Sequence, residues 1–260
     1  MCRMFGLVAA GPVSQRALLV DAPRSLGALS REHPDGWGLA LSDGEAWTLH
    51  RSVRAAAACE LYERVAREAR ASLAIAHVRQ KTVGETALEN THPFVRGRFV
   101  LAHNGTVNAA STLATHSSPE RLAELRGQTD SERLFAFLMS FVDAARDVAE
   151  GLCRAVRVLL AERDPGSVNF LLSDGDTLYA FRFGRTLHLL ERRAQGAGAS
   201  RRTPSVTLAS ERLTDEPWTE ITQGTLLAVE RGPEPRVTEL ARIRASTALV
   251  DQLGAHPLGT

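Results

Sequence analysis

Short apolar segments occur in two groups along this chain, one before and one after a helical region near its middle. The first group lies between residues 4 and 102, and the second between residues 168 and 240. Gly, Pro, Asn, Asp and Ser residues separate the segments, which is typical of β-strands joined by turns. This order favours two packed sheets with helices outside them, rather than alternating strand–helix–strand units.

The individual segments are predicted as follows. Strands are expected at Met4–Ala10, Trp37–Leu41, Ala46–His50, Leu73–Val78, Phe99–Ala102, Val168–Leu172, Leu178–Arg182, Leu187–Leu190, Val206–Ala209, Leu226–Val229 and Val237–Leu240. Helices are expected over Gln15–Ser30, Ala55–Arg70, from Pro119, over Leu134–Val142 and over Ala144–Ala161. Gly11-Pro12 is expected to end the first strand. Periodicity alone establishes only a mixed α and β class.

Composition narrows the classes of function. The chain has 260 residues, of which 44% are hydrophobic, so it can bury a sizeable core. A formal net charge of +1 argues against a nucleic-acid surface. No apolar run reaches membrane-spanning length, and no signal peptide is visible. Three cysteines, Cys2, Cys59 and Cys153, do not form a disulfide framework, so we expect a cytoplasmic protein.

Cys2 follows the initiator Met directly, and its small side chain favours removal of Met1. One residue would then carry both a thiol, with a pKa of about 8.5, and an α-amine, with a pKa of about 7.7–8. Proton transfer between the two groups is nearly balanced near neutral pH, which suits a nucleophile with its own general base. The alternative is that Cys2 is a buried residue of the first strand.

Arg79 and Asn104 each follow an apolar strand. An Arg at the end of a strand can bind a carboxylate with two parallel hydrogen bonds, but it can also be a solvated strand end. Asn104-Gly105 is a strong signal for a hairpin turn. Its functional interpretation is an oxyanion hole, in which the Asn side chain and the Gly backbone N–H donate to one developing negative charge.

Asp130 lies in the segment Thr129-Asp130-Ser131-Glu132, which fits a capping box at a helix start. The carboxylate can stabilise the helix N-terminus, hold a substrate ammonium group, or do both. His77, His92 and His103 raise the question of a metal site, but no metal-binding spacing accompanies them. We therefore expect no metal and no other cofactor.

Several motifs occur together in the order found in one family. They are Cys2, Pro34-Asp35-Gly36-Trp37-Gly38, His77-Val78-Arg79 with Thr82, Asn90-Thr91-His92-Pro93-Phe94, His103-Asn104-Gly105, Gly127–Glu132 and Ala209-Ser210-Glu211. With these motifs the chain resembles the class II glutamine amidotransferases of the N-terminal nucleophile hydrolase superfamily. The resemblance spans about residues 2–240 and is nearest to the compact single-domain branch.

The resemblance implies a role for each matching residue. Cys2 would be the nucleophile and its own amine the base, with Asn104 and Gly105 as the oxyanion hole. Arg79 would bind the α-carboxylate of the substrate, and Asp130 its α-ammonium group. Thr82, His92 and His103 would line or support the pocket. All of these roles are those of the family, assigned to the matching positions of this sequence.

The resemblance also implies a fold and a domain division. The fold would be a four-layer αββα sandwich of two mainly antiparallel sheets, in the α+β class. One amidotransferase domain would occupy residues 2–245, followed by a C-terminal tail at 246–260. After about residue 240 we expect no room for a synthase domain. The run Gln80-Lys81-Thr82-Val83 departs from the Trp-Ala-Thr-His of large synthase members.

The implied reaction is hydrolysis of a γ-glutamyl amide, with glutamine or a related compound as the small-molecule substrate. Three versions stay open: an ammonia donor to a separate synthase subunit, a hydrolase of the ergothioneine-pathway type, and a glutathione-degrading subunit with a peptidase partner. A non-catalytic γ-glutamyl-binding sensor is the alternative from another class. Residues 31–38 and 81–89 are the expected leaving-group side of the pocket.

Overall fold

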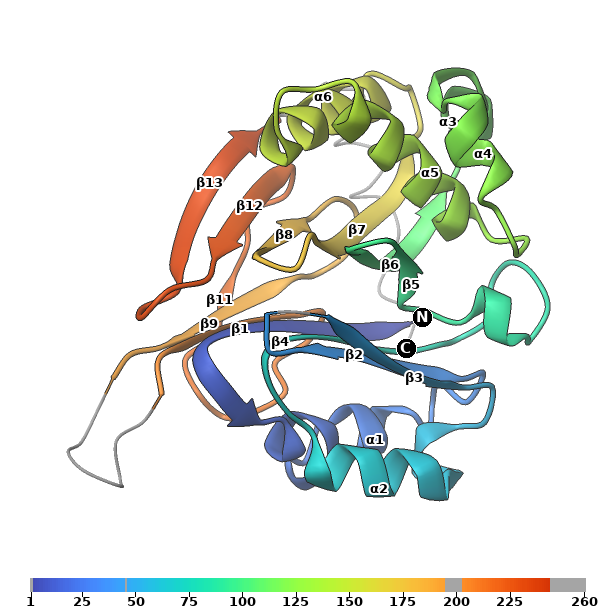
Figure 1. Ribbon diagram of the computed structural model, residues 1–260. Coiled ribbons are helices and arrows are strands. Elements are labelled where there is room, and N and C mark those ends of the chain that lie inside the picture. The colour runs from blue at the N-terminus through green and yellow to red at the C-terminus, as the bar shows by residue number, and fades with distance from the viewer. Residues whose placement is uncertain (1, 45, 195–202, 244–260) are drawn as a thin grey trace.

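A computed structural model of the chain describes residues 2–44, 46–194 and 203–243 (Figure 1). The described part contains two sheets, and every strand pairing within them is antiparallel. Helices cover the outer face of each sheet, α1 and α2 on one side and α3–α6 on the other (Figure 1). The expected four-layer αββα sandwich of the α+β class is thereby confirmed.

The first sheet has the strand order β11-β9-β10-β1-β4-β2-β3. Its strands are β1 (Arg3–Ser14), β2 (Trp37–Ser42), β3 (Trp47–Ser52), β4 (Arg70–Val78), β9 (His188–Arg192), β10 (Ser205–Ala209) and β11 (Thr219–Glu220). The second sheet has the order β13-β12-β8-β7-β6-β5. Its strands are β5 (Phe94–Arg96), β6 (Phe99–Val107), β7 (Gly166–Ser173), β8 (Thr177–Phe181), β12 (Thr225–Glu230) and β13 (Arg236–Arg242).

The longest helices of the described residues, α5 and α6, lie next to the second sheet. The helices are α1 (Leu26–Leu29), α2 (Glu60–Glu68), α3 (Ala110–His116), α4 (Pro119–Ala123), α5 (Asp130–Asp143) and α6 (Val148–Leu160), with single turns η1 (Ala17–Asp21), η2 (Ala56–Ala58) and η3 (Leu88–Asn90). Thr129 Oγ1 accepts the Glu132 N–H at the start of α5, as half of the expected capping box. The Glu132 carboxylate instead accepts the backbone N–H groups of Arg126 and Gly127.

Three apolar cores correspond to the three interfaces between the layers. One core lies between the sheets and contains Met4, Ile75, Leu171 and Leu208. A second packs the first sheet against α2 through Phe5, Trp37 and Tyr62, and a third packs the second sheet against α5 and α6. Alternate residues of β1 thus enter different cores, because successive side chains of a strand point to opposite faces.

Local expectations were wrong in three places. β1 continues past Gly11-Pro12 to Ser14. Its pairing with β4 is interrupted by an irregularity after Val8 and resumes at Val13. Residues 15–30 contain only η1 and α1 rather than one long helix. Asn104-Gly105 does not form a hairpin turn but lies within β6, paired with Asn169 and Val168 of β7.

The expected C-terminal tail at 246–260 lies outside the described residues, as do the last two residues of the expected domain, 2–245. The α3 helix and the strands β5 and β11 were not predicted. None of the helices in the described ranges combines the length and the apolar character needed to cross a membrane.

Candidate active site

The start of β1 places Cys2 at one end of the first sheet. β1 lies between β4 and β10, and Arg3 is paired with Val78, the last residue of β4. On the other side, the Ser210 N–H donates to the Met4 carbonyl over 3.0 Å. Cys2 therefore lies between the ends of two neighbouring strands, each followed by a loop that carries motif residues.

The thiol of Cys2 contacts the peptide unit that follows Arg79. The Gln80 N–H donates to the sulfur over 3.3 Å, and the sulfur lies 3.4 Å from the Gln80 carbonyl oxygen. Burial raises the pKa of the Cys2 thiol, while the Gln80 hydrogen bond and the positive charge of Arg79 act in the opposite direction. The neutral thiol is thus favoured, and a base is needed to form the thiolate.

Arg79 holds the loop that follows it. Its side chain is 3% exposed, and the guanidinium donates to the carbonyl oxygens of Glu85 and Val83 over 3.0 Å each, and to that of Gly84 over 3.4 Å. The Arg79 and Cys2 side chains interact electrostatically, since each shifts the pKa of the other. The structure therefore brings these two predicted residues together.

The same loop is fastened from two further directions. Asp35 Oδ2 accepts the Lys81 N–H over 2.7 Å, and the Asn90 side chain donates to Glu85 O over 3.0 Å and accepts the Gln128 N–H over 2.9 Å. Sequence reasoning assigned no role to Asp35, Gln80 or Asn90. Asp35 and Asn90 occur in the quoted motifs, but their backbone contacts depend on loops that the sequence alone does not place.

Asn104 lies on β6, a strand of the second sheet that contacts β1 and β4 of the first. Its side chain is almost fully buried, and no hydrogen bond joins its amide to another residue within the described ranges. The amide atoms of Asn104 are not among the fully enclosed polar atoms without a partner, so a ligand can reach and bind them. The described structure is therefore compatible with the predicted oxyanion hole.

The backbone of Gly105 has the matching orientation. Its pairing partner Val168 donates its N–H away from β6, to the Phe183 carbonyl over 2.7 Å. In an antiparallel ladder the Gly105 N–H then also points away from β7. On that side β5 pairs only with residues 99–101, so the ladder leaves this N–H uncovered. A Cβ at Gly105 would collide with the Ser167 carbonyl, which explains why glycine is required.

Asp130 is the first residue of α5 and is half-buried. Its Oδ2 accepts the Val107 N–H over 2.7 Å, which joins the helix start to the end of β6. A Cβ at Gly84 would touch the Thr129 side chain, so the loop held by Arg79 reaches the residue before Asp130. Arg79 and Asp130 therefore border the same region of the molecule.

The histidines predicted to line the pocket, His92 and His103, are buried behind the region bordered by Arg79 and Asp130. Their rings do not project freely into it. His103 uses both ring nitrogens, with Nδ1 2.8 Å from Ser131 Oγ and Nε2 3.2 Å from the Ser167 carbonyl. Since a carbonyl only accepts, Nε2 carries the proton and Nδ1 accepts from Ser131. Burial lowers the pKa of His103, although the neighbouring Asp130 raises it.

His92 packs between two other rings. Its ring centroid lies 4.4 Å from those of His77 and Phe94, and neither of its nitrogens has a hydrogen-bond partner among the described residues. Burial lowers the pKa of His77 to about 3 and that of His92 well below its usual value. Both imidazoles are thus neutral. Thr82, by contrast, is exposed in the loop held by Arg79.

Arg3 and Glu211 were not predicted as site residues, yet they adjoin the nucleophile. Arg3 donates to the Cys2 carbonyl over 3.1 Å and forms an ion pair with Glu211, which also pairs with Arg24. Glu211 belongs to the motif Ala209-Ser210-Glu211, so the sequence marked this residue. The sequence did not reveal its ion pair with Arg3. Across the described ranges, no three His, Cys, Asp or Glu side chains are arranged to hold a metal ion.

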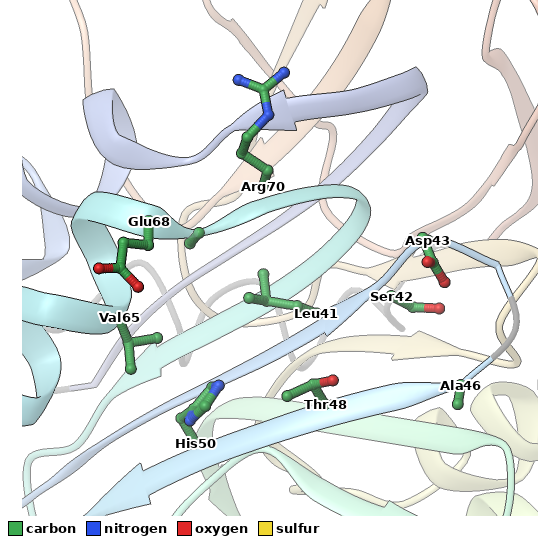
Figure 2. Close-up of a pocket in the computed structure, with 10 residues that line it drawn as sticks. Leu41, Ser42, Asp43, Ala46, Thr48, His50, Val65, Glu68 and Arg70 are labelled. Carbon is green, nitrogen blue, oxygen red and sulfur yellow. The ribbon is translucent and has the colours of Figure 1, made fainter.

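A hollow of about 330 Å³ lies far from these residues, at the other end of β2 (Figure 2). Side chains of β2, β3 and the end of α2 line it, among them Ser42, His50 and Glu68. Ser42 is paired with Leu73, whereas Trp37, at the opposite end of β2, is paired with Val78 beside Arg79. This hollow is therefore separate from the candidate active site.

Known proteins share this arrangement of sequence and fold. The family model described as "Glutamine amidotransferases class-II" matches residues 1–200. γ-Glutamyl-hercynylcysteine sulfoxide hydrolase of Mycobacterium tuberculosis (strain H37Rv) is 31% identical over 259 residues, covering 91% of this chain and 100% of the relative. YafJ of Escherichia coli (strain K12), named as a candidate glutamine amidotransferase, is 30% identical and covers 75% of this chain and 77% of the relative.

Solved structures agree with the fold. The crystal structure described as a predicted glutamine amidotransferase from Pseudomonas aeruginosa has a TM-score of 0.63 and 28% identity, covering 90% of this chain and 99% of that one. Glutamine phosphoribosylpyrophosphate amidotransferase from B. subtilis has a TM-score of 0.65 at 17% identity, covering 93% of this chain and 50% of that one. With its motifs, its two sheets and these matches taken together, the chain belongs to the class II glutamine amidotransferases.

Proposed function

We propose that this protein is a cysteine-dependent hydrolase of γ-glutamyl amides, acting on glutamine or a related γ-glutamyl compound. The observation that carries the proposal is the contact between the Cys2 sulfur and the Gln80 backbone, directly after Arg79. This contact supports the proposal because it sets the separation between a nucleophile, the Cys2 sulfur, and a cation, Arg79, that can bind the charged amino-acid end of a substrate. Membership of the amidotransferase family supports the same reaction class.

The proposed reaction begins with the mature N-terminus. The α-amine of Cys2 takes the thiol proton, and the thiolate attacks the γ-carbonyl carbon. The Asn104 amide and the Gly105 N–H stabilise the oxyanion, a contribution of about 3–4 kcal/mol per donor in related chemistry. The C–N bond then breaks, and the leaving nitrogen receives the proton from the α-ammonium group. Water hydrolyses the γ-glutamyl thioester, releasing glutamate and restoring the thiol.

Arg79 and Asp130 are proposed to read the two charges of the substrate head. The guanidinium has five N–H donors, and three of its contacts go to loop carbonyls, so donors remain for a carboxylate. Asp130 uses Oδ2 for Val107, which leaves Oδ1 for an ammonium group. Thr82, His92 and His103 then serve as supporting residues of the pocket.

A second candidate function is hydrolysis of one specific γ-glutamyl metabolite instead of glutamine. The 31% identity to the mycobacterial γ-glutamyl-hercynylcysteine sulfoxide hydrolase over its full length favours it. A sensor that binds γ-glutamyl compounds without cleaving them is the remaining alternative, and it gives no role to the Cys2 thiol. A synthase or peptidase subunit as partner belongs to the ammonia-donor and glutathione-degrading versions of the proposal.

The test begins with mass spectrometry of the purified protein to verify removal of Met1. Glutamate release is then measured from glutamine, glutathione and other γ-glutamyl amides, with Cys2→Ala beside the wild type. Diazo-oxo-norleucine, a glutamine-like electrophile, should add one label at Cys2. Cys153→Ala, a substitution in α6, is the matched control and should keep activity. Equal glutamate release by the Cys2→Ala protein would overturn the proposal.

A further inference from the structure

The buried side chain of Asn90 connects two segments that the proposed function uses separately. Asn90 is the last residue of η3 and is 2% exposed. Its Nδ2 donates to the Glu85 carbonyl over 3.0 Å, and its Oδ1 accepts the Gln128 N–H over 2.9 Å. Glu85 belongs to the loop held by Arg79, and Gln128 lies two residues before Asp130. The reaction proposed above gives Asn90 no role.

The Glu85 carbonyl oxygen receives two hydrogen bonds. Arg79 Nη1 donates to it over 3.0 Å and Asn90 Nδ2 does so over 3.0 Å, and its two lone pairs can accept both. A single oxygen atom therefore joins the Arg79 guanidinium to the Asn90 amide. Residues 81–89 were expected on the leaving-group side of the pocket, yet Glu85 in this segment contacts the arginine that is proposed to bind the substrate head.

The other end of the Asn90 amide is bonded to the start of α5. Gln128, which donates to Asn90, directly precedes Thr129, the N-cap residue of this helix. The Thr129 hydroxyl accepts the Glu132 N–H over 3.2 Å, so the cap is bonded to the first turn. Asp130 is the first residue of that turn. The bond from Gln128 to Asn90 is therefore made only two residues before Asp130, on backbone that the cap holds in place.

Close packing leaves the Asn90 amide little room to move. A Cβ at Gly127 would collide with Asn90 Oδ1, and a Cβ at Gly84 would lie 3.1 Å from Asn90 Nδ2 and 3.4 Å from the Thr129 side chain. Gly84 belongs to the loop held by Arg79, and Gly127 to the segment before α5. The backbones of the two segments thus approach the amide at both of its ends, which makes the connection between them rigid.

An amino-acid head requires a connection of this kind. Its carboxylate and its ammonium group are attached to one carbon atom, so the separation between the two charges is constant. A site that binds both charges at once must hold its own cation and carboxylate at the matching separation, and a misplacement of about 1 Å can lower a rate by about a hundredfold. The bonds from Arg79 through Glu85, Asn90 and Gln128 run continuously to the backbone just before Asp130.

We propose that Asn90 is a positioning residue that fixes the separation of Arg79 and Asp130, and that it thereby restricts the site to compounds whose carboxylate and ammonium group share one carbon atom. The proposal rests on the head-group roles that the proposed function gives to Arg79 and Asp130. Both ends of the Asn90 amide are bonded to backbone groups, so Asn90 acts through these two residues and not on the substrate itself. A compound with only one of the two charges needs only one of them in place.

The test uses the amino-acid head alone, which all γ-glutamyl substrates share. Glutamate carries both head charges, glutarate lacks the ammonium group, and 4-aminobutyrate lacks the α-carboxylate. Each is measured as a competitive inhibitor of ammonia or amine release from the γ-glutamyl compound that the wild type cleaves fastest. We expect the wild-type inhibition constant for glutamate to be at least about tenfold lower than for the other two, as one charge-assisted hydrogen bond predicts.

Asn90→Ala should raise the inhibition constant of glutamate by about tenfold, because Arg79 and Asp130 no longer meet both charges at once. The constants of glutarate and 4-aminobutyrate should stay within about twofold of the wild type, since each compound needs only one of the two residues. Asn90→Asp keeps the size of the side chain and an acceptor for the Gln128 N–H, but it loses the donor to Glu85. It should raise the glutamate constant alone by at least about threefold. Urea unfolding verifies that both variants are folded.

Asn169→Ala is the matched control. Asn169 is also fully buried, and both ends of its amide bond to backbone groups, but these belong to residues 183–186 instead of the loop held by Arg79. Its loss should change all three constants by a common factor, so that their ratios stay at the wild-type values. A common rise of all three constants in the Asn90 variants, or an unchanged glutamate constant in them, would overturn the positioning proposal alone.

Failure of the proposed function gives a different result. A wild type that binds glutarate or 4-aminobutyrate as tightly as glutamate would contradict the head-group roles of Arg79 and Asp130, and with them this proposal. Release of ammonia or amine from no γ-glutamyl compound, without labelling by diazo-oxo-norleucine, would contradict the hydrolase proposal itself.

Discussion

The backbone N–H of Gln80 points at the sulfur of Cys2, with 3.3 Å between the two atoms. Gln80 directly follows Arg79, so a single peptide unit connects the thiol to the arginine proposed to bind the substrate head. The separation of nucleophile and cation is therefore set by paired strands rather than by a free loop. Fixed positioning of this kind is a recognised source of rate acceleration.

Arg79→Lys should raise KM for γ-glutamyl substrates by about tenfold to a hundredfold, since a lysine cannot donate in parallel to a carboxylate. Arg79 contacts the carbonyls of Val83, Gly84 and Glu85 from two separate nitrogens, a spread that the single nitrogen of a lysine cannot reproduce. We therefore expect faster proteolytic cleavage within residues 81–89 of the variant. Steady-state kinetics and limited proteolysis, each with Arg154→Lys as control, measure the two effects. Unchanged KM in Arg79→Lys would remove this residue from the proposed site.

Gly105→Ala should destabilise the protein by about 1–3 kcal/mol, because the added methyl group meets the Ser167 carbonyl and β6 must shift away from β7. The same shift would move the Gly105 N–H and lower kcat. Urea unfolding and glutamate release measure the two losses. Gly11→Ala is the control, since nothing lies within 4 Å of a Cβ at that position. A fully active and equally stable Gly105→Ala protein would contradict the assignment of the Gly105 N–H to the oxyanion hole.

The order of strands and helices along the sequence suggested two packed sheets, but the four-layer sandwich was predicted from the family resemblance, since periodicity alone establishes only a mixed α and β class. The sequence was less informative where pairing overrides a local signal. Asn104-Gly105 has the composition of a turn, yet the ladder with β7 continues through it, and Gly11-Pro12 lies within an irregular part of β1. Turn propensities are local, whereas these outcomes depend on partner strands far away in the sequence.

The site was predictable only as a set of residue types. Cys2, Arg79 and Asp130 stand in family motifs, and the structure adds the contacts that arrange them. The bonds from Gln80 to Cys2, from Arg79 to the loop carbonyls and from Arg3 to the Cys2 carbonyl involve backbone atoms. Every residue type supplies these atoms, so no sequence pattern marks them.

Glu132 should be among the most important charges for stability. It is 2% exposed, forms an ion pair with Arg96 and accepts the N–H groups of Arg126 and Gly127. Glu132→Ala removes the buried carboxylate partner of Arg96 and leaves two N–H groups without an acceptor, and we expect a loss of about 3–5 kcal/mol in the free energy of unfolding. Glu124→Ala, which removes a more exposed carboxylate near the same Arg96, should cost less than about 1 kcal/mol. Urea unfolding distinguishes them, and similar losses would contradict this ranking.

Acid should unfold the protein partly through the buried, neighbouring imidazoles of His77 and His92. Burial lowers both pKa values in the folded state, that of His77 to about 3, whereas an unfolded histidine titrates near 6.5. Below pH 6.5 the unfolded chain therefore binds more protons, and each of the two groups removes about 1.4 kcal/mol of stability per pH unit as the pH falls toward its folded pKa. Above pH 6.5 this contribution is constant.

His92→Phe should therefore reduce the slope of stability against pH by one proton between pH 6 and 4.5, because one of these groups no longer titrates. Urea unfolding at several pH values gives the slope. His116→Gln, a substitution at an exposed position of α3, should keep the wild-type slope. If the His92→Phe protein loses stability as steeply as the wild type, the buried imidazole is not a source of the acid sensitivity.

Asp130→Asn separates the charge of this residue from its structural hydrogen bond. An asparagine can still accept the Val107 N–H through its amide oxygen, so α5 should stay joined to β6. The variant lacks the negative charge proposed to hold the substrate ammonium, and kcat/KM for γ-glutamyl substrates should fall by about tenfold or more. Glutaramate, the glutamine analogue without an α-amine, has no ammonium to lose, and its kcat/KM should stay within about twofold of the wild-type value. A parallel loss for glutaramate would show that Asp130 acts on the fold of the site rather than on the ammonium group.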